Sequence, residues 1–254
     1  MRAISLGSGS KGNCTLIATD TSAILVDAGF GVKDTHARLE KVGFSPDQLM
    51  AIFVTHEHGD HCQGAGRLER AWSLPVYASQ GTATGAKLDS ALPLFDGVSV
   101  TVGDIDIQPV LVAHDAREPT QFVFHSGGVR MGICTDLGSV TQHVVREFQD
   151  LDALLLEANY DPEMLARGPY PPKLKARVGG PHGHLSNQQG LDLLQQVLSP
   201  RLKKLVACHL SEKNNSVEHV QQTWQPHVPE HVDFHIASQS DGCEWLDLRE
   251  LMHG

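Results

Sequence analysis

The sequence predicts an α/β protein in which two mixed β-sheets pack together and are flanked by helices, an αββα sandwich. Three observations support this prediction. Short apolar runs bounded by Gly, Pro or Asp recur along the 254 residues, as the strands of a sheet require. Helical patterns follow strand-like runs in both halves of the chain. No Gly/Ser linker or low-complexity tract divides the sequence, so a single domain over residues 1–254 is expected.

Strands and helices can be placed from the spacing of the apolar residues. A strand is expected where a short apolar run ends at a turn residue. The strand-like runs are, in chain order, 2–6, 14–19, 22–27, 51–55, 75–78, 98–102, 105–113, 120–126, 129–135, 153–157, 204–208 and 232–236. A helix is expected where apolar residues recur with a period of about 3.6 residues. The helical patterns cover residues 33–42, 65–72 and 140–148.

Two serines mark helix starts in the last third of the chain. Ser186 and Gln189 have the spacing of a capping box, in which each side chain accepts a hydrogen bond from the backbone of the other. The helix that they open is expected to end at Leu198, because a serine and a proline follow. Ser216 can similarly cap a helix that runs through Trp224.

Composition excludes several classes of protein. The formal net charge of −10 disfavours non-specific coating of nucleic acid, although it leaves a nucleic-acid substrate open. The five cysteines are odd in number and lack a CxxC motif, so reduced thiols are expected instead of a disulfide framework. No stretch approaches the roughly 18 apolar residues of a membrane helix. We therefore expect a cytoplasmic protein that does not bind membranes.

The strongest chemical signal is the segment HEHGDH over residues 56–61, which follows the predicted strand 51–55. Side chains two residues apart in an extended segment point the same way, so His56 and His58 can approach one metal ion together. Asp60 and His61 follow at a turn, where a glycine gives the backbone freedom. One loop can therefore supply ligands to two adjacent metal ions.

Four more polar side chains stand at the ends of predicted strands. Asp27 closes the run 22–27, and the other three, His114, Asp136 and His209, each follow directly after an apolar run. Imidazole and carboxylate groups are common metal ligands in proteins. Brought together by the fold, these residues would surround the HEHGDH segment.

This pattern resembles that of the metallo-β-lactamase fold superfamily, and the resemblance covers nearly the whole chain. It implies the αββα sandwich and a centre with two metal ions. The implied ligands are His56, His58 and His114 for one ion, Asp60, His61 and His209 for the other, and Asp136 as the bridge between them. The resemblance also implies that Asp27 orients the metal loop without binding an ion.

The ligand types bear on the cofactor and on the reaction. Imidazole suits zinc, and a mixed set of imidazole and carboxylate also suits manganese or iron. We therefore expect two divalent ions, Zn²⁺ or Mn²⁺, with Fe²⁺ as a further option. Such a pair lowers the pKa of water and stabilises both oxygens of an in-line displacement, which suits attack on a phosphodiester. The presence of both Asp60 and Asp136 resembles superfamily hydrolases of phosphodiesters or thioesters, so Asp60 is predicted to be catalytic as well as a ligand.

Four short motifs resemble the bacterial YycJ/WalJ-type branch of the superfamily. They are SGSKGN over residues 8–13, EANYD over 157–161, GHLSN over 183–187 and HLSEKNN over 209–215. Proteins of this branch are described as nucleases or phosphodiesterases, with 5′ exonuclease activity on DNA implied. The chain lacks the long β-CASP insertion of the larger RNA exonucleases.

Residues 158–185 interrupt the alternation of strands and helices. This stretch contains five prolines and ends in a segment with His182 and His184. A long loop inside a compact domain is usually functional or disordered. His184 is expected at the mouth of the metal site, where it would contact the scissile phosphate or protonate the leaving oxygen; packing beside Ser186 is the alternative. His182 is expected to be a secondary contact.

Further substrate contacts are expected from polar turns. Ser8, Ser10 and Asn13 can offer donors to a phosphate from a glycine-rich turn, although a plain tight turn explains the same residues. Asn214 is expected either to hold substrate or to shape its own turn. Glu157 can orient a ligating histidine. A basic stretch can bind phosphates or be solvated surface, and its members are Arg167, Lys173, Lys175 and Arg177.

The sequence therefore predicts a dinuclear metal-dependent phosphodiesterase, a nuclease of the 5′ exonuclease type that acts on DNA. The alternative is a small-molecule cyclic or linear phosphodiesterase, which the negative net charge favours. A metal-binding regulatory protein without turnover is less consistent with a ligand at every expected position. Assembly into a homo-oligomer is left open.

Overall fold

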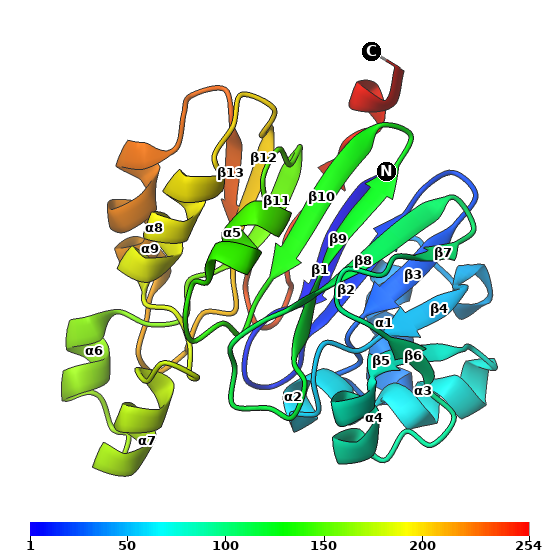
Figure 1. Ribbon diagram of the computed structural model, residues 1–254, viewed down its shortest axis with the longest axis horizontal. Coiled ribbons are helices and arrows are strands. Elements are labelled where there is room, and N and C mark those ends of the chain that lie inside the picture. The colour runs from blue at the N-terminus through cyan, green and yellow to red at the C-terminus, as the bar shows by residue number, and fades with distance from the viewer. Residues whose placement is uncertain (254) are drawn as a thin grey trace.

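The computed structural model describes residues 1–253 and contains two seven-stranded sheets (Figure 1). The strands of the first sheet are β1 Arg2–Gly7, β2 Cys14–Ala18, β3 Ala23–Val26, β4 Ala51–Phe53, β5 Val76–Ser79, β6 Leu92–Leu94 and β14 Leu246–Asp247. Those of the second sheet are β7 Val100–Val102, β8 Ile105–Leu111, β9 Thr120–Ser126, β10 Val129–Cys134, β11 Ala153–Glu157, β12 Lys204–Cys208 and β13 Asp233–Ile236. Their spatial orders are β14-β1-β2-β3-β4-β5-β6 and β13-β12-β11-β10-β9-β8-β7.

Helices cover the outer faces of the two sheets. The α-helices are α1 Val32–Lys41, α2 Gly59–Cys62, α3 Ala65–Trp72, α4 Gln80–Ala86, α5 Gln142–Glu147, α6 Pro162–Arg167, α7 Pro172–Val178, α8 Asn187–Val197 and α9 Val217–Trp224. Short 3₁₀ turns are η1 Pro46–Gln48, η2 Gln225–His227 and η3 Arg249–His253. Figure 1 shows α1, α3 and α4 beside the first sheet, α5, α8 and α9 beside the second, and α6 and α7 projecting at one end.

Successive side chains of a strand pack into different apolar clusters, one on each face of the sheet. In β11, Leu155 belongs to the cluster between the sheets together with Phe53 and Phe122. Its neighbour Leu154 belongs to the cluster beneath α8 and α9, which includes the fully buried Trp224. A third cluster lies between the first sheet and helices α1 and α3. Successive side chains of a strand point to opposite faces, so a strand that is apolar on both faces is covered on both sides.

Each sheet has one parallel half, and this arrangement positions the polar strand ends. Strands β3 to β6 run parallel in the first sheet, and strands β10 to β13 run parallel in the second. In open α/β sheets, ligands bind outside the carboxyl ends of the parallel strands. The segments that follow β3, β4, β10 and β12 therefore emerge where a site is expected.

The predicted sandwich of two mixed sheets flanked by helices is confirmed. Each predicted strand is present with bounds that differ by at most two residues. Both predicted caps are formed: the Ser186 hydroxyl accepts a hydrogen bond from the Gln189 backbone within a capping box, and Ser216 accepts one from His219. No helix within residues 1–253 combines the length and the apolar character that a membrane crossing needs.

The segment 158–185 differs from the uninterrupted loop that its prolines suggested, because it contains α6 and α7. Asp161 caps α6 by accepting a hydrogen bond from Met164, and Pro162 occupies the first helical position. Proline is well suited to that position, since its missing N–H has no partner there in any case. The HEHGDH turn likewise forms the short helix α2, and β6, β14 and α4 are further elements that the apolar spacing did not predict.

Candidate metal centre

Three polar residues leave their strands in a left-handed backbone conformation. Asp27 follows β3 with φ of 63°, Asp136 lies just after β10 with φ of 52°, and His209 follows β12 with φ of 57°. Such values are uncommon outside glycine and cost about 1–3 kcal/mol each when they are strained. Strain of this kind concentrates at functional sites, and here it falls on three of the residues that the sequence singled out.

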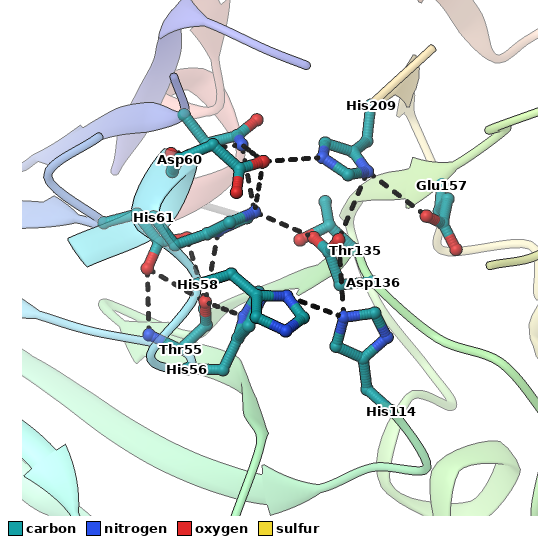
Figure 2. A network of polar contacts seen from close by, with 12 residues as sticks. Thr55, His56, His58, Asp60, His61, His114, Thr135, Asp136, Glu157 and His209 are labelled. Atoms are coloured by element: carbon teal, nitrogen blue, oxygen red, sulfur yellow. Dashed lines mark hydrogen bonds and ion pairs between the residues drawn. The ribbon is translucent and has the colours of Figure 1, made fainter. Parts of the chain in front are cut away.

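The first donor set consists of His56, His58 and His114. Nε2 of His56 lies 3.0 Å from Nδ1 of His58, and Nε2 of His114 lies 3.3 Å from the same Nδ1 (Figure 2). His56 and His114 are buried, whereas His58 is half-buried. Three ring nitrogens from two segments that are far apart in sequence therefore converge on one point.

The second donor set consists of Asp60, His61 and His209. Oδ2 of Asp60 lies 3.5 Å from Nε2 of His61 and 3.8 Å from Nε2 of His209. Both histidines are buried. In each donor set, one ligand atom from each residue lies within 4.8 Å of those of the other two, close enough for a shared ion.

Asp136 lies between the two donor sets, as Figure 2 shows. Its Oδ2 is 3.2 Å from Nε2 of His61, and its Oδ1 is 3.9 Å from Nε2 of His114. Oδ2 of Asp136 and Nε2 of His209 are both buried without a hydrogen-bond partner. Buried polar atoms are nearly always satisfied, and an ion is a common partner for those that are not. The unpaired atoms and the imidazole and carboxylate donors therefore fit divalent metal ions.

Asp27 is tied to the loop that carries the histidines. Its Oδ1 accepts hydrogen bonds from the backbone N–H and the hydroxyl of Thr55, at 2.8 and 2.9 Å. Its Oδ2 lies 2.7 Å from Nδ1 of His61. A carboxylate that engages one ring nitrogen fixes the ring orientation and leaves the other nitrogen for a ligand role.

Glu157 plays the corresponding part on the second sheet. Its Oε1 lies 2.7 Å from Nδ1 of His184 and 3.2 Å from Nδ1 of His209. Its Oε2 accepts hydrogen bonds from the backbone N–H groups of Leu137 and Leu185, at 3.1 and 2.9 Å. Both oxygens of this fully buried carboxylate are therefore engaged by the protein. Glu157, His184, His209 and Asp136 also lie close enough together to be considered as a metal-binding group.

The histidines of the centre differ in their electrostatic surroundings. Burial lowers the pKa of His56 well below its ordinary value, and burial also lowers the pKa of His114. Burial has the same tendency at His61 and His209, but nearby carboxylates, above all Asp136, outweigh it. They raise the pKa of His61 well above its ordinary value and that of His209 to about 10. The centre thus concentrates buried carboxylate charge that cations must balance.

An open cavity of about 360 Å³ adjoins the two donor sets. Asp60, Asp136, His184 and His209 are among the residues that line it. Ser10 lies on its rim, as the prediction of a substrate contact requires. Another part of the wall comes from Leu174, Arg177 and Val178 of α7 and from Tyr170, which lies two residues before this helix.

Four residues that were expected to contact substrate do not line this cavity. Ser8 is buried, and its hydroxyl accepts a 2.8 Å hydrogen bond from the backbone N–H of His209. Asn13 is also buried, and its Nδ2 lies 2.9 Å from Nε2 of His61. Asn214 is fully buried and bonds Ser211 within its turn. His182 is exposed outside the cavity.

The cavity includes functional candidates that the sequence analysis did not single out. Oδ1 of Asp115 lies 3.4 Å from Nε2 of His114 and 3.6 Å from Nε2 of His58. Asn159 donates a 2.9 Å hydrogen bond from Nδ2 to the backbone oxygen of His209. The available signals were an acid directly after a ligand-type histidine and the asparagine of the EANYD motif.

Comparison with known proteins agrees with this geometry. The family model of the β-lactamase superfamily domain matches residues 22–209. Exodeoxyribonuclease WalJ of Streptococcus pneumoniae is 35% identical over 249 residues, covering 92% of this chain and 93% of the relative. Exodeoxyribonuclease YycJ of Bacillus anthracis is 34% identical over 220 residues, covering 84% and 83% of the two chains.

Solved structures share the fold at low sequence identity. The metallo-β-lactamase fold protein YhfI of Bacillus subtilis has a TM-score of 0.75 at 15% identity, covering 97% of this chain and 99% of that one. Zn²⁺-bound PqqB of Methylobacterium extorquens has a TM-score of 0.74 at 14% identity, covering 98% and 100%. With the family model and the two nuclease relatives, the chain belongs to the metallo-β-lactamase superfamily, in the branch that contains WalJ and YycJ.

Proposed function

We propose that this protein is a dinuclear metal-dependent phosphodiester hydrolase that removes nucleotides from the ends of DNA. One observation carries the proposal: two donor sets, with Asp136 between them, border an open cavity. Four of these residues line it, namely His58, Asp60, Asp136 and His209. The similarity to two proteins named exodeoxyribonucleases, over most of their length, supports the choice of substrate.

The donor sets define which residues would hold metal. The first ion would be held by His56, His58 and His114, the second by Asp60, His61 and His209, and Asp136 would contact both. A pair of divalent ions makes a nucleophile available from water at neutral pH and stabilises the attacking and leaving oxygens. Asp27 and Glu157 would orient ligands, because the protein already engages both oxygens of each carboxylate.

His184 is the residue of this chain best placed to act on the leaving group. It lines the cavity, and its ring centroid is 5.2 Å from that of His114 and 5.4 Å from that of His209. The hydrogen bond from Nδ1 to Glu157 leaves Nε2 for the substrate. In this position an imidazolium can donate its proton to the departing alkoxide, or bind a non-bridging phosphate oxygen.

The remaining predicted contacts take a supporting role in this proposal. Ser10 stays a substrate contact, because it lies at the cavity. Ser8 would hold the backbone at His209, and Asn13 would hold the metal loop at Asp60, whose backbone oxygen accepts a 2.7 Å hydrogen bond from the backbone N–H of Asn13. Asn214 would shape its turn, and His182 is left out of the site.

A direct assay tests the proposal against the small-molecule alternative. Purified protein with Mn²⁺ or Zn²⁺ is incubated with end-labelled DNA, end-labelled RNA and bis(p-nitrophenyl) phosphate. Mononucleotides released from DNA, faster than from RNA and dependent on added metal, are the expected result. Asp136→Asn, purified in the same way, is the negative control, because any DNA cleavage that it retains would come from a contaminating nuclease. Hydrolysis of the small diester far faster than that of any polymer would instead support a small-molecule phosphodiesterase.

A further inference from the structure

Helix α7 presents one of its cationic side chains to the cavity. Arg177 lines the cavity, whereas Lys173 and Lys175 do not. Leu174 and Val178 also line it, and positions 174, 177 and 178 share one face of a helix. Nζ of Lys175 instead bonds the backbone oxygen of Ala166. The basic stretch in the sequence is therefore divided by the fold, and Arg177 is its member at the candidate active site.

Asp115 holds Arg177 beside the first donor set. Nε of Arg177 donates a hydrogen bond to Oδ2 of Asp115. The other oxygen of this carboxylate, Oδ1, is the atom that lies 3.4 Å from His114 and 3.6 Å from His58. Oδ1 is buried and has no hydrogen-bond partner. A single carboxylate thus separates the guanidinium from the predicted metal ligands.

Arg177 can exchange the carboxylate of Asp115 for another hydrogen-bond acceptor. The side chain of Arg177 remains 58% exposed and that of Asp115 26% exposed, and ion pairs open to solvent contribute little to stability. A guanidinium also binds phosphate through the same planar, two-pronged geometry that it uses for a carboxylate. A phosphate that enters the cavity can therefore replace Asp115 on Arg177 without disrupting the fold.

We propose that Arg177 binds a second phosphate of the nucleic-acid strand, next to the phosphate at the metal centre, and leaves Asp115 to do so. This inference rests on the proposed function, because an isolated diester carries no second phosphate. It makes Arg177 a specificity-determining residue, which favours a linkage with a neighbouring phosphate over a lone diester. The adjacent phosphate would be terminal or internal, depending on the polarity of digestion.

Three thymidine dinucleotides test the assignment. TpT carries only the scissile phosphate, pTpT adds a 5′-phosphate, and TpTp adds a 3′-phosphate. The wild type is expected to have a higher kcat/KM, through a lower KM, for one of the doubly phosphorylated compounds than for TpT. Arg177→Gln is expected to lose this preference, which is worth roughly 10- to 100-fold for a charged hydrogen bond, so that its ratio of kcat/KM between the two compounds falls to about one. The preferred compound also identifies the side of the scissile bond that Arg177 contacts.

Two further variants separate a phosphate contact from other effects. Lys173→Gln makes the same change in charge on the same helix, away from the cavity, and is expected to keep the preference. Asp115→Asn breaks the same ion pair but leaves the guanidinium free, so the preference should also survive, whatever happens to kcat. If the pair instead only fastens α7 over the cavity, Asp115→Asn should lose the preference as Arg177→Gln does, which would overturn the assignment.

Equilibrium binding gives a second readout that does not depend on turnover. Fluorescence anisotropy with a labelled DNA oligonucleotide measures Kd across a series of salt concentrations. Loss of one phosphate contact should reduce the slope of log Kd against log salt by about one in Arg177→Gln but not in Lys173→Gln. Wild-type DNA cleavage with no preference among the dinucleotides would overturn the role of Arg177 alone. A wild type that cleaves neither DNA nor dinucleotides would overturn the proposed function, and this inference with it.

Discussion

Nδ1 of His184 donates a 2.7 Å hydrogen bond to Oε1 of Glu157, a carboxylate with no exposure to solvent. The two residues come from segments 27 positions apart, the end of β11 and the GHLSN motif before α8. Because the same carboxylate also accepts two backbone N–H groups, its position is fixed by the fold. The orientation of His184 therefore depends on Glu157, and the first prediction concerns this dependence.

His184→Ala should retain both metal ions and the native fold while losing most of kcat. General acid assistance is worth typically about 10²–10⁴-fold, and His184 is the cavity histidine outside the two donor sets. Steady-state kinetics on a DNA oligonucleotide and elemental analysis of the same preparation measure the two quantities. Loss of metal in this variant would make His184 a ligand, and an unchanged kcat would make its role structural.

The supporting carboxylate should matter less than the histidine. Glu157→Gln keeps the shape of the side chain but weakens the bond that orients His184, so a loss of about 10–100-fold in kcat is expected. His182→Ala is the matched control, because it removes an imidazole from the same segment outside the cavity. Equal effects of His182→Ala and His184→Ala would indicate that the segment, and not one imidazole, controls activity.

Asp136→Asn and Asp27→Asn should have different effects on metal content. Oδ2 of Asp136 is buried between the donor sets without a hydrogen-bond partner, so neutralising this carboxylate should abolish occupancy of at least one site. Asp27 uses both oxygens on Thr55 and His61, so Asp27→Asn should keep two ions and bind them about 10–100-fold more weakly. Elemental analysis gives the stoichiometry, and titration with a competing chelator gives the affinity. A metal-depleted Asp27→Asn at saturating metal would show that Asp27 is itself a ligand.

The features that could be predicted from the sequence are those that depend on residues close together along the chain. His56, Asp136 and His209 follow strands whose apolar spacing is a local signal, and parallel strands place their carboxyl ends at one edge. The convergence of these candidate ligands was therefore predictable from strand ends and the HEHGDH spacing. The caps at Ser186 and Ser216 were predictable for the same reason, since each depends on residues within one helical turn.

Contacts between distant segments could not be predicted from one sequence. The Asp115–Arg177 pair spans 62 positions, and nothing local distinguishes Arg177 from the neighbouring lysines until α7 is placed against the cavity. The sequence also does not show which way the side chains of a turn point. Ser8 was therefore expected to face the substrate, but its hydroxyl accepts a hydrogen bond from the backbone of His209 instead. The helices of segment 158–185 were missed for a different reason, because three of its five prolines, Pro162, Pro171 and Pro172, lie at helix starts.

Removal of metal should lower the thermal stability of the wild type. A ligand that binds only the folded state stabilises it by about 2.7 kcal/mol at a free concentration 100 times its Kd. For a chain of this size, that free energy corresponds to roughly 5–10 °C in Tm. Differential scanning fluorimetry of metal-free protein, titrated with Zn²⁺ or Mn²⁺, measures the shift. Asp136→Asn should show a reduced shift, and an equal shift in both proteins would place the bound metal elsewhere.

Gly190→Ala should reduce both stability and activity, although it lies in a helix, where alanine is usually favoured. A Cβ at Gly190 in α8 would lie 2.5 Å from the backbone oxygen of Glu157 and 2.8 Å from Cζ2 of the buried Trp224. Neither neighbour can move freely, so overpacking should cost about 1–3 kcal/mol and displace the strand end that holds Glu157. Urea unfolding and kcat measure the two effects.

Gly66→Ala in α3 is the matched control for this substitution. The nearest atoms to a Cβ there, in Arg70 and Leu88, lie at 3.5 Å, an ordinary contact distance. Alanine should therefore stabilise the protein by about 0.4–1 kcal/mol through the unfolded state and leave kcat unchanged. The two variants together separate helix propensity from the close approach of α8 to β11. If Gly190→Ala also stabilised the protein with full activity, α8 could shift without moving Glu157, and the rigid support of His184 would have to come from elsewhere.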